Sequence, residues 1–98
     1  MNREQLIAKA AEIEVPELTA ETLVDYALDG TPTGGFLQAV LSNDLFEAYG
    51  RADDYNMAAM RQIVEFVYNS LPSECWGSVE RVAGWTGLNK HELANEER

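Results

Sequence analysis

The apolar residues between positions 57 and 71 recur at intervals of three and four, a spacing that places them along one side of an α-helix. A stripe this wide has to be buried against other parts of the chain. It therefore predicts the central core helix of the domain, with Met60, Ile63, Val64 and Val67 at its centre, and Pro72 predicts where that helix ends. The stripe consists of Met57, Met60, Ile63, Val64, Val67, Tyr68 and Leu71.

Local signals divide the first thirty residues into two further helices. Asn2 and Gln5 have the spacing of a capping box, and Pro16 predicts the end of the helix that they start. Thr19 is the expected N-cap of the second helix. Gly30 is expected to end it, because glycine adopts the left-handed conformation that closes many helices.

Residues 31–35, Thr-Pro-Thr-Gly-Gly, predict a turn, and helical spacing of apolar residues continues beyond it. Ser42, Asn43 and Asp44 lie in the middle of that stretch. Because all three side chains compete for backbone hydrogen bonds, we expect them to interrupt the helix and to cap a second short one. The alternative is that they lie on its polar side. Asp53, Asp54 and Asn56 are candidate caps of the core helix.

The sequence shows no sustained strand alternation, so the pattern predicts an all-α fold. A chain of 98 residues is long enough for one compact domain and too short for two. We therefore expect residues 1–98 to form a single domain of five or six short helices, with a tail after about residue 94 that is disordered.

The chain carries 17 acidic residues against seven Lys and Arg, a net charge of −10. Binding to a nucleic-acid backbone requires clustered positive charge, and the cations here are scattered singly. The same charge repels anionic membranes, and no apolar run is long enough for a membrane span. The sequence therefore predicts no direct nucleic-acid binding, no membrane association, a cytoplasmic location, and a protein partner with a basic surface. The oligomeric state stays open.

The residue types needed for most catalytic and metal sites are sparse. One cysteine and one histidine exclude an internal disulfide and are too few for a usual zinc site. Residues 53–56 lack the spacing of a calcium loop, and residues 30–35 lack the Lys of a phosphate loop. We therefore expect no metal, no cofactor and no enzymatic activity. Cys75 is interpreted as a small buried hydrophobic side chain, with a reactive thiol as the alternative.

Residues 30–45 read GTPTGGFLQAVLSNDL, and residues 75–85 read CWGSVERVAGW. Together with Arg51, Asp53, Asn56 and the segments 63–64 and 66–69, this pattern resembles a family of short uncharacterised proteins encoded by bacteriophages and prophages. The resemblance covers just over half of the chain. It implies a phage or prophage setting inside a bacterial host cell, and it implies no particular activity.

Charge and resemblance together predict a non-enzymatic accessory protein that binds a host or phage protein through an acidic helical surface. One form of this role is to counter a host defence, as an anti-CRISPR-like mimic of nucleic acid. The alternatives are a virion or assembly component that acts as an oligomer, and a small enzyme or nucleotide binder. Binding residues concentrate in loops at helix ends, so the candidate partner-binding residues are Gly34, Gly35, Asn43, Asp44, Asp53, Asp54, Asn56 and Trp76.

Two aromatic features have more than one interpretation. Trp76 either packs a neighbouring helix against the core or is exposed as an apolar anchor for a partner. Tyr49, Tyr55 and Tyr68 each combine an apolar ring with a polar tip, which suits a core position or a binding surface equally.

Overall fold

A computed structural model describes residues 2–90, and this part of the chain is built from helices without a strand. The all-α prediction is confirmed. Met1 and residues 91–98 lie outside the described residues, and so does the tail that we expected to be disordered. The elements are α1 (Arg3–Glu12), α2 (Glu17–Asp29), α3 (Gly35–Leu41), α4 (Leu45–Arg51), α5 (Asp54–Ala58), α6 (Met60–Ser70), the short 3-10 helix η1 (Ser73–Cys75) and α7 (Val79–Gly84).

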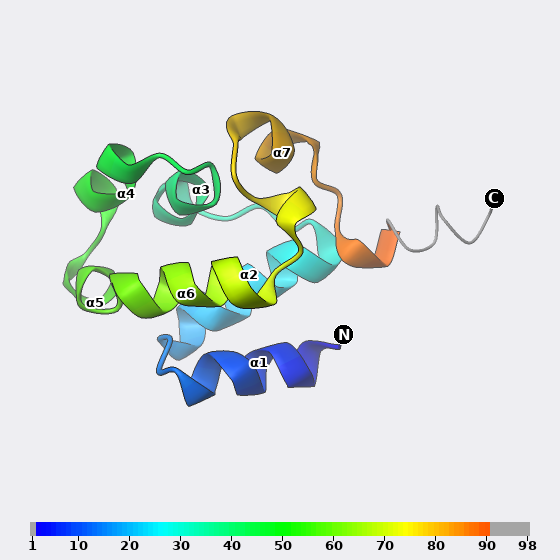
Figure 1. The fold of residues 1–98 in the computed structure, drawn as a ribbon, viewed down its shortest axis with the longest axis horizontal. Helices are drawn as coiled ribbons and strands as arrows, with labels where there is room; N and C mark the ends of the chain where they lie inside the picture. The colour runs from blue at the N-terminus through cyan, green and yellow to red at the C-terminus, as the bar shows by residue number, and fades with distance from the viewer. Residues whose placement is uncertain (1, 91–98) are drawn as a thin grey trace.

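The second helix, α2, lies at the centre of the fold. It packs against α1 and α6, and in Figure 1 it runs behind α6. Six of its 13 residues are buried, against four of 11 in α6. The prediction that the helix over 57–71 lies at the centre holds in part, because α6 packs against α1, α2 and α5, whereas α2 has the larger buried share. The buried residues of α2 lie on several sides of the helix, which is why neighbours can surround it: Ala20, Leu23, Val24, Tyr26, Ala27 and Leu28.

The boundaries of the first two helices follow local rules in three of four cases. The capping box of Asn2 and Gln5 is present, and Gly30 ends α2 with a left-handed φ of 73°. The first helix closes before Pro16, through backbone bonds around Glu14, whose φ is 64°. The prediction for Thr19 is wrong, because α2 already begins at Glu17. Thr19 instead uses its hydroxyl to bond the side chain of Asn56, 3.0 Å away.

The helical stretch is interrupted between α3 and α4 at Ser42, Asn43 and Asp44, as predicted. Asn43 adopts a φ of 63°, and its N–H donates to the Val40 carbonyl while that of Asp44 donates to Ala39. These two bonds satisfy carbonyl groups at the end of α3. Asp44 then caps α4 by accepting a bond from the backbone N–H of Glu47.

The predicted helix over residues 57–71 is divided into α5 and α6 by a turn at Ala59. Asp53 is a cap, but of the short α5 and not of the core helix. In α6, Met60, Ile63 and Val67 are buried as predicted, whereas Val64 is 47% exposed, so its assignment to the centre of the core is wrong. The reason is rotational: residues in a helix are about 100° apart, and position 64 falls beyond the edge of the buried face.

The C-terminal part of the described chain packs against the end of α2 through close backbone contacts and hydrogen bonds. Gly30 and Gly87 both have a positive φ, and their backbones cross so closely that a Cβ atom on Gly30 would lie 2.6 Å from the Thr86 backbone. The indole N–H of Trp85 donates to the carbonyls of Tyr26 and Ala27, at 3.0 and 3.2 Å. These contacts place α7 beside α3 and η1 against α7, and Figure 1 shows α7 above α6.

The neighbouring positions 63 and 64 test the orientation of α6. Ile63→Ala should lower the free energy of unfolding by about 2–5 kcal/mol, because it removes a fully buried side chain. Val64→Ala should change it by about 0.5 kcal/mol or less. Urea unfolding monitored by circular dichroism measures both. Equal losses at the two positions would contradict the orientation of α6 described here.

Candidate functional site

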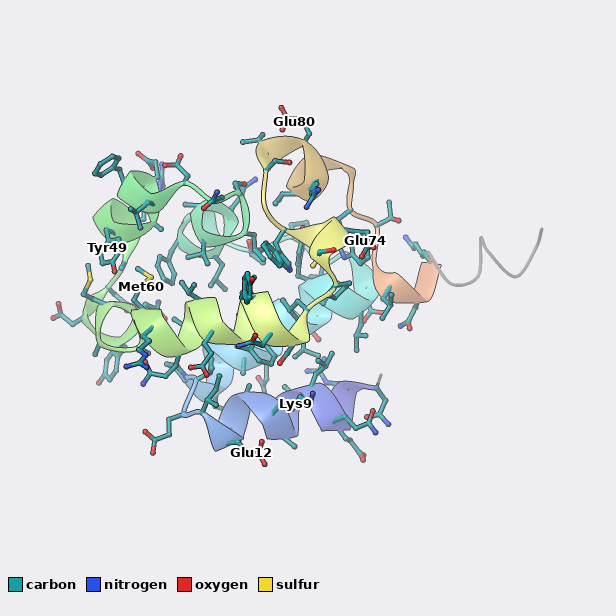
Figure 2. The ribbon with its side chains drawn as sticks, in the orientation of Figure 1. Lys9, Glu12, Tyr49, Met60, Glu74 and Glu80 are labelled. Carbon is teal, nitrogen blue, oxygen red and sulfur yellow. The ribbon has the colours of Figure 1, made fainter. Side chains whose placement is uncertain are left out.

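A groove with a volume of about 850 Å³ runs between α6 on one side and α3 and α4 on the other. Its floor is a small apolar cluster of Ala39, Ala48 and Met60, separate from the main core. Two of these three side chains are single methyl groups, so they join α3 and α4 to α6 without filling the space above them. Figure 2 shows Tyr49 of α4 and Met60 of α6 directed into the space between the helices.

The walls of the groove carry large apolar side chains that the fold leaves in solvent. Leu45 and Tyr49 of α4 are 62% and 46% exposed, and Val64 and Tyr68 of α6 are 47% and 68% exposed. Single exposed apolar residues are common on protein surfaces, but a contiguous group around a concavity is typical of a binding site.

The two apolar faces of α6 explain how the groove arises. Ile63 and Phe66 are fully buried in the main core. Val64 and Tyr68 lie about 40° and 80° round the helix axis from Met60, on the side away from Phe66. The apolar stripe predicted for this helix is therefore wider than the core can cover, and its uncovered edge lines the groove.

Trp76 closes one end of the groove, where it packs on the core and stays partly exposed. It is half-buried, and its ring lies 5.6 Å from that of Tyr68, centroid to centroid, at a tilt of 44°. Its indole N–H donates to the carbonyl of Leu71 at 3.2 Å. The next residue, Gly77, donates its N–H to Leu41 at the end of α3, 2.7 Å away. Trp76 thus packs on the core with one part and lines the groove with another.

Of the eight predicted binding residues, three line this groove: Asn43, Asp44 and Trp76. Asn43 and Asp44 also shape the break between α3 and α4, so they have a structural role as well. The structure therefore brings part of the predicted set together and leaves the rest outside the groove.

The other five predicted residues have local roles at helix starts. Gly34 precedes α3 and Gly35 begins it, beside the side chain of Arg51. Asp53 caps α5 by accepting a bond from the N–H of Asn56, Asp54 is exposed in the first turn, and Asn56 is bonded to Thr19.

Sequence reasoning did not assign Leu45 or Val64 to a binding site, and it left Tyr49 and Tyr68 open between a core position and a binding surface. For Val64 and Tyr68, the signal that could have decided this was the width of the 57–71 stripe. Between Phe66 and Tyr68 the apolar residues span about 200° of the helix, more than one packing face needs. The role of Leu45 and Tyr49 depended on the placement of α4 across the groove from α6, which periodicity does not indicate.

Both signs of charge line the groove, with an excess of acid. Asp44 and Glu65 contribute carboxylates, and Arg61 contributes a guanidinium group. Arg51, on α4, is already paired with Glu47 at 2.6 Å, and the hydrogen bond to that carboxylate raises the pKa of Arg51. Over residues 35–70 as a whole, five carboxylates stand against two guanidinium groups. The surroundings of the groove are therefore net acidic.

The Cys75 thiol is part of the core, as the sequence suggested. Its side chain is fully buried, and its backbone carbonyl accepts a 2.8 Å bond from the Tyr26 hydroxyl. Burial, and to a smaller extent the nearby Glu74 carboxylate, raise the pKa of Cys75 to about 12. A thiol held protonated in this way is a poor nucleophile at neutral pH.

The described part of the chain lacks two further features. Residues 2–90 contain no group of three or more His, Cys, Asp or Glu side chains placed to hold a metal ion. Over the same residues, no helix has the length and apolar character needed to cross a bilayer.

Substitutions at the neighbouring residues Asp53 and Asp54 distinguish the effect of a helix cap on stability from the effect of surface charge. Asp53→Ala should lower the free energy of unfolding by about 1 kcal/mol, because it leaves the Asn56 N–H without its capping bond. Asp54→Ala removes the same charge without that bond, and should cost about 0.5 kcal/mol or less. Thermal or urea unfolding of both variants measures the difference, and a larger loss at Asp54 would contradict the capping geometry.

Because the Cys75 thiol is buried, we expect the free energy of unfolding to fall at alkaline pH. The folded protein keeps the Cys75 proton up to a pKa of about 12, whereas the unfolded chain loses it near about pH 8.5. Stability from this group is therefore fully present below about pH 8.5 and falls as the pH rises towards 12. Unfolding measured between about pH 8 and 10 should show this decline. Cys75→Ala should have a flatter profile there, and an unchanged slope would refute the assignment.

Comparison of the chain with protein-family models, curated proteins and solved structures finds no match. The resemblance to phage proteins over residues 30–85 stays a prediction. The groove and its charge are therefore the features of this chain that bear on its function.

Proposed function

We propose that this protein works without catalysis, by binding another protein through the groove between α6 and the α3–α4 pair. The observation that carries the proposal is the set of large apolar side chains exposed around that groove, with Leu45, Tyr49, Val64 and Tyr68 in its walls. Their burial by a partner would remove apolar surface from water, which is the main favourable term in most protein association.

The partner is a protein with a basic surface. The net charge of −10 attracts such a surface at long range and repels nucleic acid and other acidic chains. Apolar contact in the groove then supplies most of the affinity, while the acidic surroundings favour rapid encounter and correct orientation.

The biological setting belongs to the same proposal. The resemblance over residues 30–85 suggests a phage or prophage accessory protein acting in the cytoplasm of a bacterial host. A small acidic protein of this kind would counter a host defence by covering a basic surface that otherwise binds nucleic acid.

Site-specific photo-crosslinking tests the groove as the binding surface. A photoreactive phenylalanine analogue replaces Tyr68 in the groove or, as the matched control, Leu18, an exposed apolar residue of α2 that does not line it. In a host lysate, the position-68 protein should crosslink to a distinct protein that the position-18 protein does not capture. Equal crosslinking at both positions, or crosslinking to nucleic acid alone, would refute the proposal.

The charge contribution predicts how association depends on salt. With the captured partner purified, the association rate constant should fall by roughly an order of magnitude between about 0.05 and 0.5 M salt. The dissociation rate should change much less, because it reflects the apolar contact. Stopped-flow fluorescence measures both rates, and an association rate that is indifferent to salt would contradict steering by the acidic surface.

A further inference from the structure

We infer that the groove binds a single amphipathic α-helix of the partner, with its apolar stripe against the groove and basic residues along the edges of that stripe. This inference rests on the proposed function and specifies the chemistry of what the groove accepts.

The lining of the groove favours a helix over an extended segment. An extended peptide would bring unpaired backbone N–H and C=O groups into a largely apolar site, and such groups are costly to bury without partners. No strand within residues 2–90 offers an edge on which they could pair. A helix arrives with its backbone bonds already made, and presents only side chains to Val64, Tyr68 and Leu45.

The dimensions of the site also suit a helix. One wall is α6, whose 11 residues extend over about 16 Å, or three helical turns. A partner helix lying along it would place apolar side chains at positions i, i+3 or i+4, and i+7 into the groove. It would cover the apolar edge of α6 that the core leaves exposed, as another helix does in a bundle.

Charge selects a basic helix over a second copy of this chain. Two chains that each carry a charge of −10 repel one another, and the region from α3 to α6 is itself net acidic. Glu65 and Asp44, on opposite sides of the groove, are placed to meet Lys or Arg side chains beside the apolar stripe. Arg61, one turn before Glu65 on α6, is the exception and would oppose a basic side chain.

Selection from a library of displayed, randomised peptides of about 16 residues, long enough for four helical turns, tests the inference. Wild-type protein is the target, and binders to a Val64→Glu variant are removed. The enriched peptides should combine helical spacing of apolar residues with a net positive charge, and a synthesised one should gain helicity on binding. Enriched sequences that are extended or acidic, or no enrichment above background, would overturn the inference.

Charge variants on one helix face sharpen the test with the synthesised peptide. Glu65→Lys should weaken its binding by about tenfold, Arg61→Glu should tighten it, and Leu18→Glu should change it by less than about twofold. Circular dichroism checks that every variant is folded. If Glu65→Lys and Arg61→Glu shift affinity in the same direction, a basic partner helix is excluded.

The two proposals can fail separately. A partner that crosslinks at position 68 while the library yields no basic helix would retain the groove as the binding surface and remove the helical ligand. Self-association seen by analytical ultracentrifugation and abolished by Val64→Glu would instead identify a second copy as the occupant, which overturns the inference.

Discussion

The buried hydrogen bond from the Tyr26 hydroxyl to the Cys75 carbonyl joins the centre of the fold to its C-terminal part. It links residues 49 positions apart in the sequence, and it satisfies a hydroxyl that burial would otherwise leave without a partner. The same turn of α2 accepts the indole N–H of Trp85 through its backbone. The position of η1 and α7 therefore depends on α2.

This anchoring has a consequence at the surface. The segment that carries Cys75 into the core carries Trp76 to the end of the groove, where it meets Tyr68. Gly77 then bonds to the end of α3, which holds the α3–α4 pair at one end. The floor cluster around Met60 holds it further along. Between these attachments the two sides of the groove stay apart, and their apolar side chains remain exposed.

The proposed function rests on α6, which carries more apolar surface than the core of the fold covers. A helix that had one neighbour would bury its stripe and present polar residues elsewhere. Here the buried side meets the core through Ile63 and Phe66, and the apolar surface continues past it through Val64 and Tyr68. The fold gains nothing from apolar side chains left in water, and in the proposed function a partner covers them. The acidic excess on the same elements is the reason for proposing that this partner is basic.

The sequence by itself determined the helical class, the capping box at Asn2, the stop at Gly30 and the break at Asn43, because each depends on the conformational preferences of a few adjacent residues. It also determined the net acidity of the chain, because net charge follows directly from the numbers of acidic and basic residues. The tertiary structure alone decided that α2 is central, that Val64 is exposed, and that Leu45 and Tyr49 face α6. Helical periodicity indicates the direction in which a side chain points, whereas its burial depends on which distant segment packs there, and that choice is made by the packing of the whole chain.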